Sequence, residues 1–148
     1  MLVYMDCCCL NRREDDMTQD KIRMESYVIT GILLRCFYGQ WKLIGSDVVE
    51  YEIMQNTNLS RKIRALALYS IRREKIYLNK NIMTRALEIQ KYGLKQLDSL
   101  HFASAEYRKV DVLLTVDREF IVRSKRTGSN LRVENPISWY MEVMKNDK

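Results

Sequence analysis

The sequence lacks any apolar run of the roughly 18 residues that are needed to span a bilayer. Its apolar beginning, Met1–Met5, is too short for a secretory signal and has neither a basic leader nor a small-residue cleavage site. We therefore expect a cytoplasmic protein with no membrane partner. Proline occurs once, and no Gly/Ser-rich linker, internal repeat or low-complexity tract interrupts the chain, which predicts a single domain over residues 1–148.

The four cysteines do not follow the spacing of a disulfide framework or of a zinc site. Three are consecutive, Cys7, Cys8 and Cys9, and the fourth is Cys36. There is no C-x-x-C pair, and the lone histidine, His101, does not stand at a zinc-type spacing from any of them. We expect reduced, partly buried thiols.

The charge balance is basic, with 25 Lys and Arg against 19 Asp and Glu and a net charge of +6. A basic surface favours anionic partners such as nucleic acid or an acidic protein, although solubility alone explains a charge of this size equally well. The composition, 47% hydrophobic and 30% charged, is that of a folded chain rather than a disordered one.

The hydrophobic pattern alternates between short runs and longer helical periods. Apolar runs predict strands at Leu2–Met5, Leu43–Ile44, Ile76–Leu78, Val110–Thr115 and Leu131–Val133. Helical spacing predicts helices between them, at 19–37, 48–55, 60–73, 81–92, 97–108, 117–126 and 137–145. Consecutive apolar residues at 112–114 suit a central strand covered on both faces. The alternation predicts an α/β fold with a central, mostly parallel sheet.

Acidic residues follow the predicted strands. Asp6 comes directly after the first strand, Asp117 just after the fourth, and both Glu50 and Glu52 lie in the helix after the second. Asp98 stands in the first turn of a mostly apolar helix, where a buried carboxylate needs a partner or a metal. Sites in parallel sheets gather at the carboxyl ends of the strands, so these positions converge on one edge. Taken singly, each also fits an ordinary role as a cap, a first-turn acid or a turn residue.

Carboxylates that crowd into one site repel each other, and a divalent cation relieves this repulsion. Oxygen ligands suit the hard ions Mg²⁺ or Mn²⁺ rather than zinc. Such an ion lowers the pKa of bound water and neutralises charge on a phosphodiester, while a basic surface holds a nucleic-acid backbone. The acidic cluster and the basic charge together predict a metal-dependent nuclease.

Four segments of the sequence resemble the motifs of PIN domains. Residues 3–6 (Val-Tyr-Met-Asp) resemble the opening strand and first acid, and residues 45–53 resemble the segment that carries the second acid. Residues 97–105 resemble the D-x-x-H-x-A helix, and residues 112–120 resemble the strand that ends in a T-x-D turn. The resemblance covers almost the whole chain, and the helix together with the T-x-D turn is its most specific part.

The resemblance implies a three-layer α/β/α fold and a Mg²⁺- or Mn²⁺-dependent endoribonuclease that hydrolyses RNA. PIN proteins of this size are commonly VapC-like toxins of toxin–antitoxin pairs, which are usually homodimers silenced by a protein antitoxin. Carried over by position, the catalytic acids are Asp6, Glu52, Asp98 and Asp117, and the metal ligands are Asp6, Asp98 and Asp117.

Two positions leave alternatives open. The family's spacing from Ser46 selects Glu52 as the second acid, but Glu50 is two residues earlier, about 200° away around the helix, and remains the alternative. Cys7 stands where the family often has a small polar residue, and a thiol forms weaker hydrogen bonds than a hydroxyl.

Several neighbouring residues have both a functional and a structural interpretation. Thr115 can position Asp117 through its hydroxyl or simply belong to its strand. His101, one turn after Asp98, can act as a base, but a helix histidine satisfied by a nearby group fits better. Ser46 fits a helix cap better than a site residue. Basic residues that can contact RNA, each with a solvated surface as the alternative, are Arg12, Arg118, Arg123 and Lys125.

Partner surfaces are expected on two amphipathic segments, 19–37 and 60–73. Leu68 and Tyr69 are the exposed apolar candidates there, for an antitoxin or a second copy, and core packing is the alternative. The main alternative to a ribonuclease is a non-catalytic PIN-like module that binds RNA or a protein. A metal-dependent phosphatase or DNase would use the same carboxylate chemistry.

Overall fold

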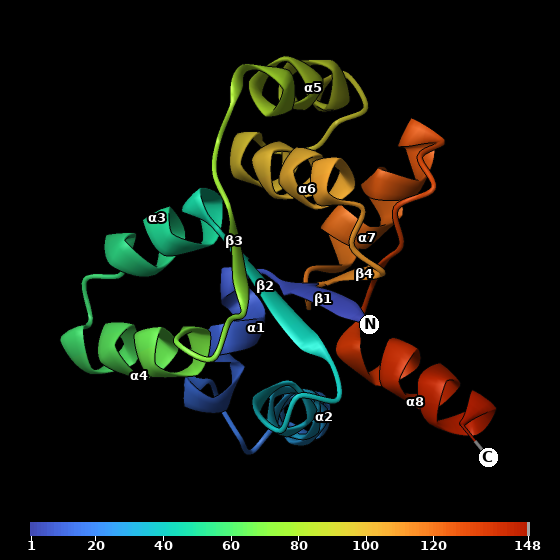
Figure 1. Cartoon of the computed structure of the whole chain (residues 1–148). Helices are drawn as coiled ribbons and strands as arrows, with labels where there is room; N and C mark the ends of the chain where they lie inside the picture. The colour runs from blue at the N-terminus through green and yellow to red at the C-terminus, as the bar shows by residue number, and fades with distance from the viewer. Residues whose placement is uncertain (148) are drawn as a thin grey trace.

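The computed structural model describes residues 1–147 and contains a five-stranded parallel sheet between layers of helices (Figure 1). The strands are β1 (Leu2–Met5), β2 (Lys42–Ser46), β3 (Glu74–Ile76), β4 (Val112–Leu114) and β5 (Val133–Glu134). They are ordered β3-β2-β1-β4-β5, and each neighbouring pair runs parallel. The predicted three-layer α/β/α fold is confirmed.

Helices connect the strands and cover both faces of the sheet. They are α1 (Cys7–Asn11), α2 (Asp20–Phe37), α3 (Asp47–Gln55), α4 (Leu59–Tyr69), α5 (Lys80–Gln90), α6 (Gln96–Arg108), α7 (Arg118–Ser124) and α8 (Pro136–Asn146), with short 3₁₀ helices at Arg12–Glu14 and Lys125–Thr127. Figure 1 shows α5, α6 and α7 on one side of the sheet and α1, α2 and α4 on the other, with α8 beside α2. α3 contacts both α4 and α6. Within residues 1–147, no helix is both long and apolar enough to cross a membrane.

The sheet is the centre of the hydrophobic core because its inner strands are apolar on both faces. Val112, Leu113 and Leu114 of β4 are fully buried, which confirms that the run of consecutive apolar residues forms a central strand. β2 leads directly into α3 because the Ser46 hydroxyl accepts a hydrogen bond from the Val49 backbone N–H at 3.0 Å. The predicted cap role of Ser46 is confirmed.

The strand order reverses between β1 and β4. The chain proceeds from β1 to β2 and β3 on one side, then returns to place β4 and β5 on the other. In such sheets, ligands bind outside the carboxyl ends of the two strands at the reversal. Met5 pairs with Leu114, and the Asp6 backbone N–H donates to the Leu114 carbonyl at 3.2 Å. Asp6 and Thr115 therefore leave the sheet side by side at this point.

β3 lies earlier in the chain than the predicted strand 76–78. The Arg73 backbone N–H donates to the Leu43 carbonyl at 2.9 Å, so pairing with β2 begins before Glu74. Tyr77 and Leu78 are exposed beyond the end of the strand. An edge strand has one hydrogen-bonded neighbour, and backbone pairing rather than side-chain burial sets its limits here.

The other edge strand, β5, begins later than the predicted strand 131–133. The Leu113 backbone N–H donates to the Arg132 carbonyl at 2.8 Å, and the Thr115 N–H donates to the Glu134 carbonyl at 3.0 Å. The ladder thus runs through residues 132–134. The short helix α1 was not predicted, because five residues are too few to show a helical period.

The C-terminal part of the predicted helix 60–73 is not helical, and its Tyr69 is not exposed. α4 ends at Tyr69, which is buried, while Leu68 is partly buried against the core. The Tyr69 ring fills the space beside Gly45, where a Cβ atom would overlap it, and the Tyr69 hydroxyl donates to the Ser46 carbonyl at 3.3 Å. The core-packing alternative is therefore correct for Tyr69.

Candidate active site

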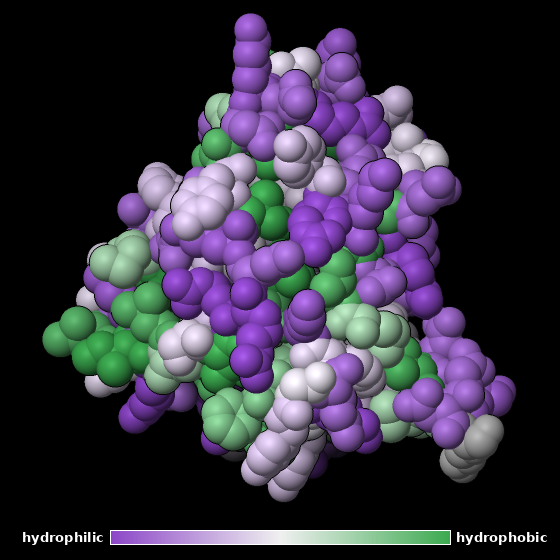
Figure 2. Space-filling view, viewed as in Figure 1, coloured by the Kyte–Doolittle hydropathy of each residue, from purple (hydrophilic) through white to green (hydrophobic). Residues whose placement is uncertain are grey.

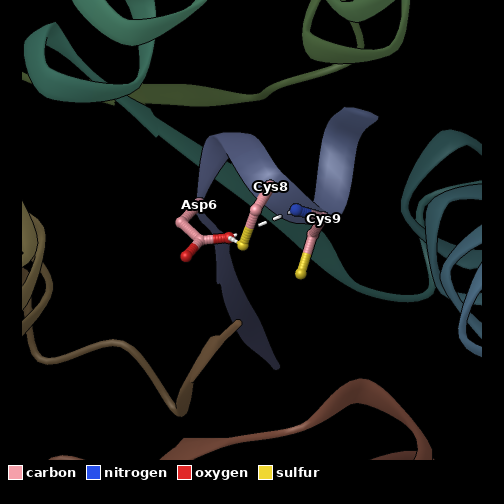
Figure 3. A group of neighbouring side chains, drawn as sticks. All are labelled: Asp6, Cys8 and Cys9. Atoms are coloured by element: carbon pink, nitrogen blue, oxygen red, sulfur yellow. Dashed lines mark hydrogen bonds between the residues drawn. The ribbon is translucent and has the colours of Figure 1, made fainter. Parts of the chain in front are cut away.

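Asp6 lies at the carboxyl end of β1 and is buried. Its Oδ1 accepts hydrogen bonds from the Cys8 thiol at 2.8 Å and from the Cys9 backbone N–H at 3.2 Å, so Asp6 caps α1 (Figure 3). Burial raises the pKa of Asp6, and the charge of His101 and the bonds from its neighbours oppose that rise. The supporting thiol belongs to Cys8. The resemblance to PIN domains places the small polar residue at Cys7 instead. The Cys7 thiol accepts a hydrogen bond from the Asn11 side-chain amide at 3.3 Å.

Asp117 follows β4 and is positioned by Thr115. The buried Thr115 hydroxyl accepts a hydrogen bond from the Asp117 backbone N–H at 3.1 Å. Asp117 Oδ1 accepts from the backbone N–H groups of Glu119 at 3.0 Å and Phe120 at 3.3 Å, so Asp117 also caps α7. Because the cap uses Oδ1, the second oxygen of Asp117 is left for another ligand.

Asp98, in the first turn of α6, is half-buried near the other carboxylates. Its pKa is raised to about 6, and burial is the largest cause. The negative charge of Asp117 is the next cause, and the charges of Asp6 and Glu52 act in the same direction. Asp98 on α6 therefore lies close enough to the other three carboxylates, from β1, α3 and the β4–α7 turn, to be repelled by each of them.

None of the three aspartates forms an ion pair with a lysine or an arginine within residues 1–147. Buried carboxylates without a cationic partner are costly, and an oxygen-only donor set of this kind suits Mg²⁺ or Mn²⁺. Asp6, Asp98 and Asp117 therefore fit a divalent cation by their chemistry.

The raised pKa of Asp98 predicts that the metal-free protein loses stability as the pH rises. Its ordinary pKa is 3.8, so between about pH 4 and pH 6 the unfolded chain releases this proton before the folded chain does. The stability that protonated Asp98 contributes is therefore present below pH 4 and lost as the pH passes 6. Allowing for solvent screening, we expect the loss to be about 1 kcal/mol.

Urea denaturation in EDTA at several pH values measures this loss, with Asp98→Asn as the matched variant. The free energy of unfolding of the variant should fall by about 1 kcal/mol less than that of the wild type over the same pH range. Equal pH dependence in the two proteins would contradict the proximity of Asp98 to the other charges.

Glu52 and Glu50 point to different surroundings. Glu52 accepts a hydrogen bond from Nε2 of His101, which lies on α6. Glu50 forms ion pairs with Lys75 and, at 3.8 Å, with Arg72. The geometry therefore favours Glu52 over Glu50 as the acid that shares a site with Asp98.

A buried chain of hydrogen bonds fixes His101. The Tyr4 hydroxyl lies 2.6 Å from His101 Nδ1 and 2.7 Å from the Ser46 hydroxyl. The Tyr4 and Ser46 hydroxyls can each donate or accept in this chain, while the Glu52 carboxylate accepts from His101 Nε2. Both ring nitrogens of His101 therefore have hydrogen-bond partners, which supports the structural interpretation. No sequence pattern pointed to Tyr4, because its position fits an ordinary apolar residue of the first strand.

The basic candidates differ in how far neighbouring acids engage them. Arg12 binds Asp15 at 3.0 Å and the fully buried Glu25 at 2.9 Å, which favours a structural role. Arg123 donates to the Gly93 carbonyl at 3.1 Å. Arg118 and Lys125, which follow Asp117, are exposed and form no ion pair within residues 1–147.

A second donor set lies at the same place. Within residues 1–147, Asp6, Cys8 and Cys9 are the one group of three potential ligands whose donor atoms all lie within 4.8 Å of one another. Asp6, Asp98 and Asp117 do not form such a group among the residues described. The thiols were not predicted at the site, since consecutive cysteines match no metal-binding spacing.

The fold of this chain is similar to that of proteins with solved structures, although its sequence matches no known family. No protein-family model and no curated protein matches the sequence. By structure, the chain is similar to a chain of VapBC2 from Rickettsia felis bound to a promoter DNA fragment, with a TM-score of 0.60 and 17% identity over 91% of this chain and 98% of that one. It is also similar to a chain of VapBC-1 from nontypeable Haemophilus influenzae, with a TM-score of 0.56 and 16% identity over 93% and 99% of the two chains.

A further solved structure shows the same likeness. PAE2754 from Pyrobaculum aerophilum matches with a TM-score of 0.55 and 12% identity over 98% of this chain and 90% of that one. The likeness covers nearly the whole of each chain, and the parallel sheet with acids after its strands agrees with the motifs of the sequence. The chain therefore has the VapC-like PIN-domain fold.

Proposed function

We propose that this protein is a Mg²⁺- or Mn²⁺-dependent endoribonuclease. The observation that carries the proposal is the half-buried Asp98, whose pKa is raised first by burial and then by three neighbouring carboxylates that have no lysine or arginine partner within the residues described. A set of acids in this state is poised to bind a divalent cation. The active domain would work in the cytoplasm, where RNA is available.

Each residue of the site would have a separate task. Asp6, Asp98 and Asp117 would hold the ion, and the bound ion would supply an activated water and neutralise phosphodiester charge. Thr115 orients Asp117 through its backbone N–H. Glu52, held in place by His101, would orient the attacking water.

Exposed cations next to the site would hold the RNA backbone. Arg118 and Lys125 lie at the start and just after the end of α7, which Asp117 caps. Both side chains are free to pair with phosphates, and such contacts give an affinity that falls with salt.

We propose further that the protein is the toxin of a toxin–antitoxin pair and forms a homodimer. Two of the similar structures are VapBC complexes, and a third is FitAB bound to a DNA fragment. Large apolar side chains are exposed on this chain; Figure 2 shows such side chains over the N-terminal end of α4, at the left of the view. Those of α3 and α4 that are more than half exposed are Tyr51, Met54, Leu59 and Ile63.

The test is cleavage of an end-labelled single-stranded RNA by the purified protein. We expect cleavage in Mg²⁺ or Mn²⁺ to exceed cleavage in EDTA by at least about 100-fold. A DNA of the same sequence and a phosphate monoester should not be hydrolysed at a comparable rate. RNA that binds without being cleaved in either ion would instead identify a non-catalytic RNA-binding module.

A further inference from the structure

The first turn of α1 brings two thiols beside the Asp6 carboxylate. Figure 3 shows the two sulfur atoms and the carboxylate extending to the same side of the turn. Cys8 donates to Asp6 Oδ1 at 2.8 Å, and all three donor atoms lie within 4.8 Å of one another. Cys8 is partly exposed while Asp6 and Cys9 are buried, so an ion could enter past Cys8.

These three donors differ from the oxygen-only set in the ions that they select. Thiolate sulfur favours soft or borderline ions such as Zn²⁺ and Cd²⁺, which also stand above Mg²⁺ and Mn²⁺ in affinity for most protein ligands. A Zn–S bond is about 2.3 Å and a Zn–O bond about 2.0–2.2 Å, so ligand atoms within 4.8 Å of one another can reach one ion with small side-chain shifts. Three protein ligands leave a fourth position of a tetrahedral ion open to water.

We propose that Asp6, Cys8 and Cys9 bind one thiophilic divalent ion, such as Zn²⁺ or Cd²⁺. Binding breaks the two S–H bonds, forms two sulfur–metal bonds and one oxygen–metal bond, and releases two protons to solvent. It replaces the hydrogen bond from Cys8 to Asp6 and the long one, 3.4 Å, from the Cys9 thiol to the Leu114 carbonyl. No change of backbone path is needed, because all three residues belong to one turn.

This ion would inhibit the proposed nuclease. Asp6 cannot serve the thiophilic ion and Mg²⁺ at the same time, so the two ions compete for one carboxylate. The inhibition, unlike the binding itself, rests on the proposed function.

The other two cysteines are matched controls. Cys7 is the neighbour of Cys8 on the same short helix, but its thiol contacts the Asn11 amide instead of Asp6. Cys36 is buried at the end of α2. Neither belongs to the group of three donors.

The experiment is a titration of the reduced, metal-free protein with Cd²⁺, followed by the ultraviolet charge-transfer absorption of sulfur–cadmium bonds. We expect one equivalent of Cd²⁺ to bind with absorption from two thiolates. Cys8→Ser and Cys9→Ser should each halve the absorption and weaken binding by at least about 10-fold, since loss of a ligand costs at least as much as loss of its supporting partner. Cys7→Ser and Cys36→Ser should leave both quantities unchanged.

Asp6→Asn keeps both thiols, so it tests the third ligand without removing a sulfur. It should retain the charge-transfer band but require about 10-fold more Cd²⁺ to reach it. Circular dichroism identifies variants that fold. A wild type without the band, or a band that Cys7→Ser reduces as much as Cys8→Ser does, would overturn the proposal.

A second measurement separates this site from the proposed activity. RNA cleavage in Mg²⁺ should be inhibited by stoichiometric Zn²⁺ in the wild type and in Cys7→Ser, and at least about 10-fold more Zn²⁺ should be needed in Cys8→Ser. If the wild type cleaves no RNA, the proposed function fails while the cadmium titration still decides the ion site. If the protein binds Cd²⁺ but Zn²⁺ does not reduce RNA cleavage in Mg²⁺, the proposed competition for Asp6 is wrong.

Discussion

Replacing Asp98 by asparagine is expected to lower RNA cleavage by at least about 10³-fold, which corresponds to roughly 4 kcal/mol of transition-state stabilisation. The amide keeps the size of the side chain and removes the negative charge that would hold the ion. Besides burial, the negative charges of Asp117, Asp6 and Glu52 all raise the pKa of Asp98, so the charge of Asp98 interacts with the whole cluster. Removal of that charge should relieve the repulsion in the metal-free protein at the same time.

The activity and the stability of Asp98→Asn should therefore change in opposite directions. At pH 7 in EDTA, the free energy of unfolding should rise by about 1 kcal/mol, while single-turnover cleavage in saturating Mg²⁺ falls. Asp20→Asn is the control, because Asp20 is exposed on α2 and pairs with Arg23. A variant that keeps more than a tenth of the wild-type cleavage rate would refute the role of Asp98.

Replacing Glu52 by glutamine is expected to lower the cleavage rate by about 100-fold, whereas Glu50→Gln should change it by less than about twofold. Glutamine at 52 can still accept the hydrogen bond from His101 Nε2, so the buried chain to Tyr4 is preserved. The loss in rate would then report the charge of Glu52 and not a collapse of its surroundings.

Glu50→Gln is the matched control for this prediction. It makes the same chemical change two residues earlier on α3, where the side chain pairs with Lys75 and Arg72. Partly exposed pairs of this kind are worth less than about 1 kcal/mol, so the variant should fold normally. Comparing kcat of the two variants on one RNA decides the assignment, and a larger loss at Glu50 would reverse it.

The sequence predicted the inner part of the fold well and its edges poorly. β1 was predicted at its observed limits, and β4 and the helix that carries Asp98 at nearly theirs, because burial on both faces or on one stripe imposes a strong hydrophobic pattern. β3 and β5 were displaced, because hydrogen bonds to a single neighbour set their limits. Tyr69 was predicted to be exposed but is buried. Helical spacing does not show that the missing side chain of Gly45, on another element, leaves room for the Tyr69 ring.

The aspartates of the candidate site could be proposed from the sequence, since parallel strands end at one edge and acids follow those ends in the chain. The surroundings of these acids could not. Cys8 reaches Asp6 because α1 begins there, and Tyr4 reaches His101 across 97 residues of sequence because β1 lies beneath α6. Neither contact depends on a regular spacing of hydrophobic residues, so neither can be predicted from the sequence pattern.

The sequence alone determined that an α/β sheet would carry acids at its strand ends, because local hydrophobic periods and short turn segments encode both. It also indicated an oxygen-ligated ion and no cysteine site, because spacing is all that a sequence offers. Only the tertiary structure decided that the chain reverses between β1 and β4, that Glu52 rather than Glu50 faces His101, and that two of three consecutive thiols face Asp6. Each of these depends on long-range packing or on the direction of a side chain in a short turn, and packing fixes such directions only in the folded chain.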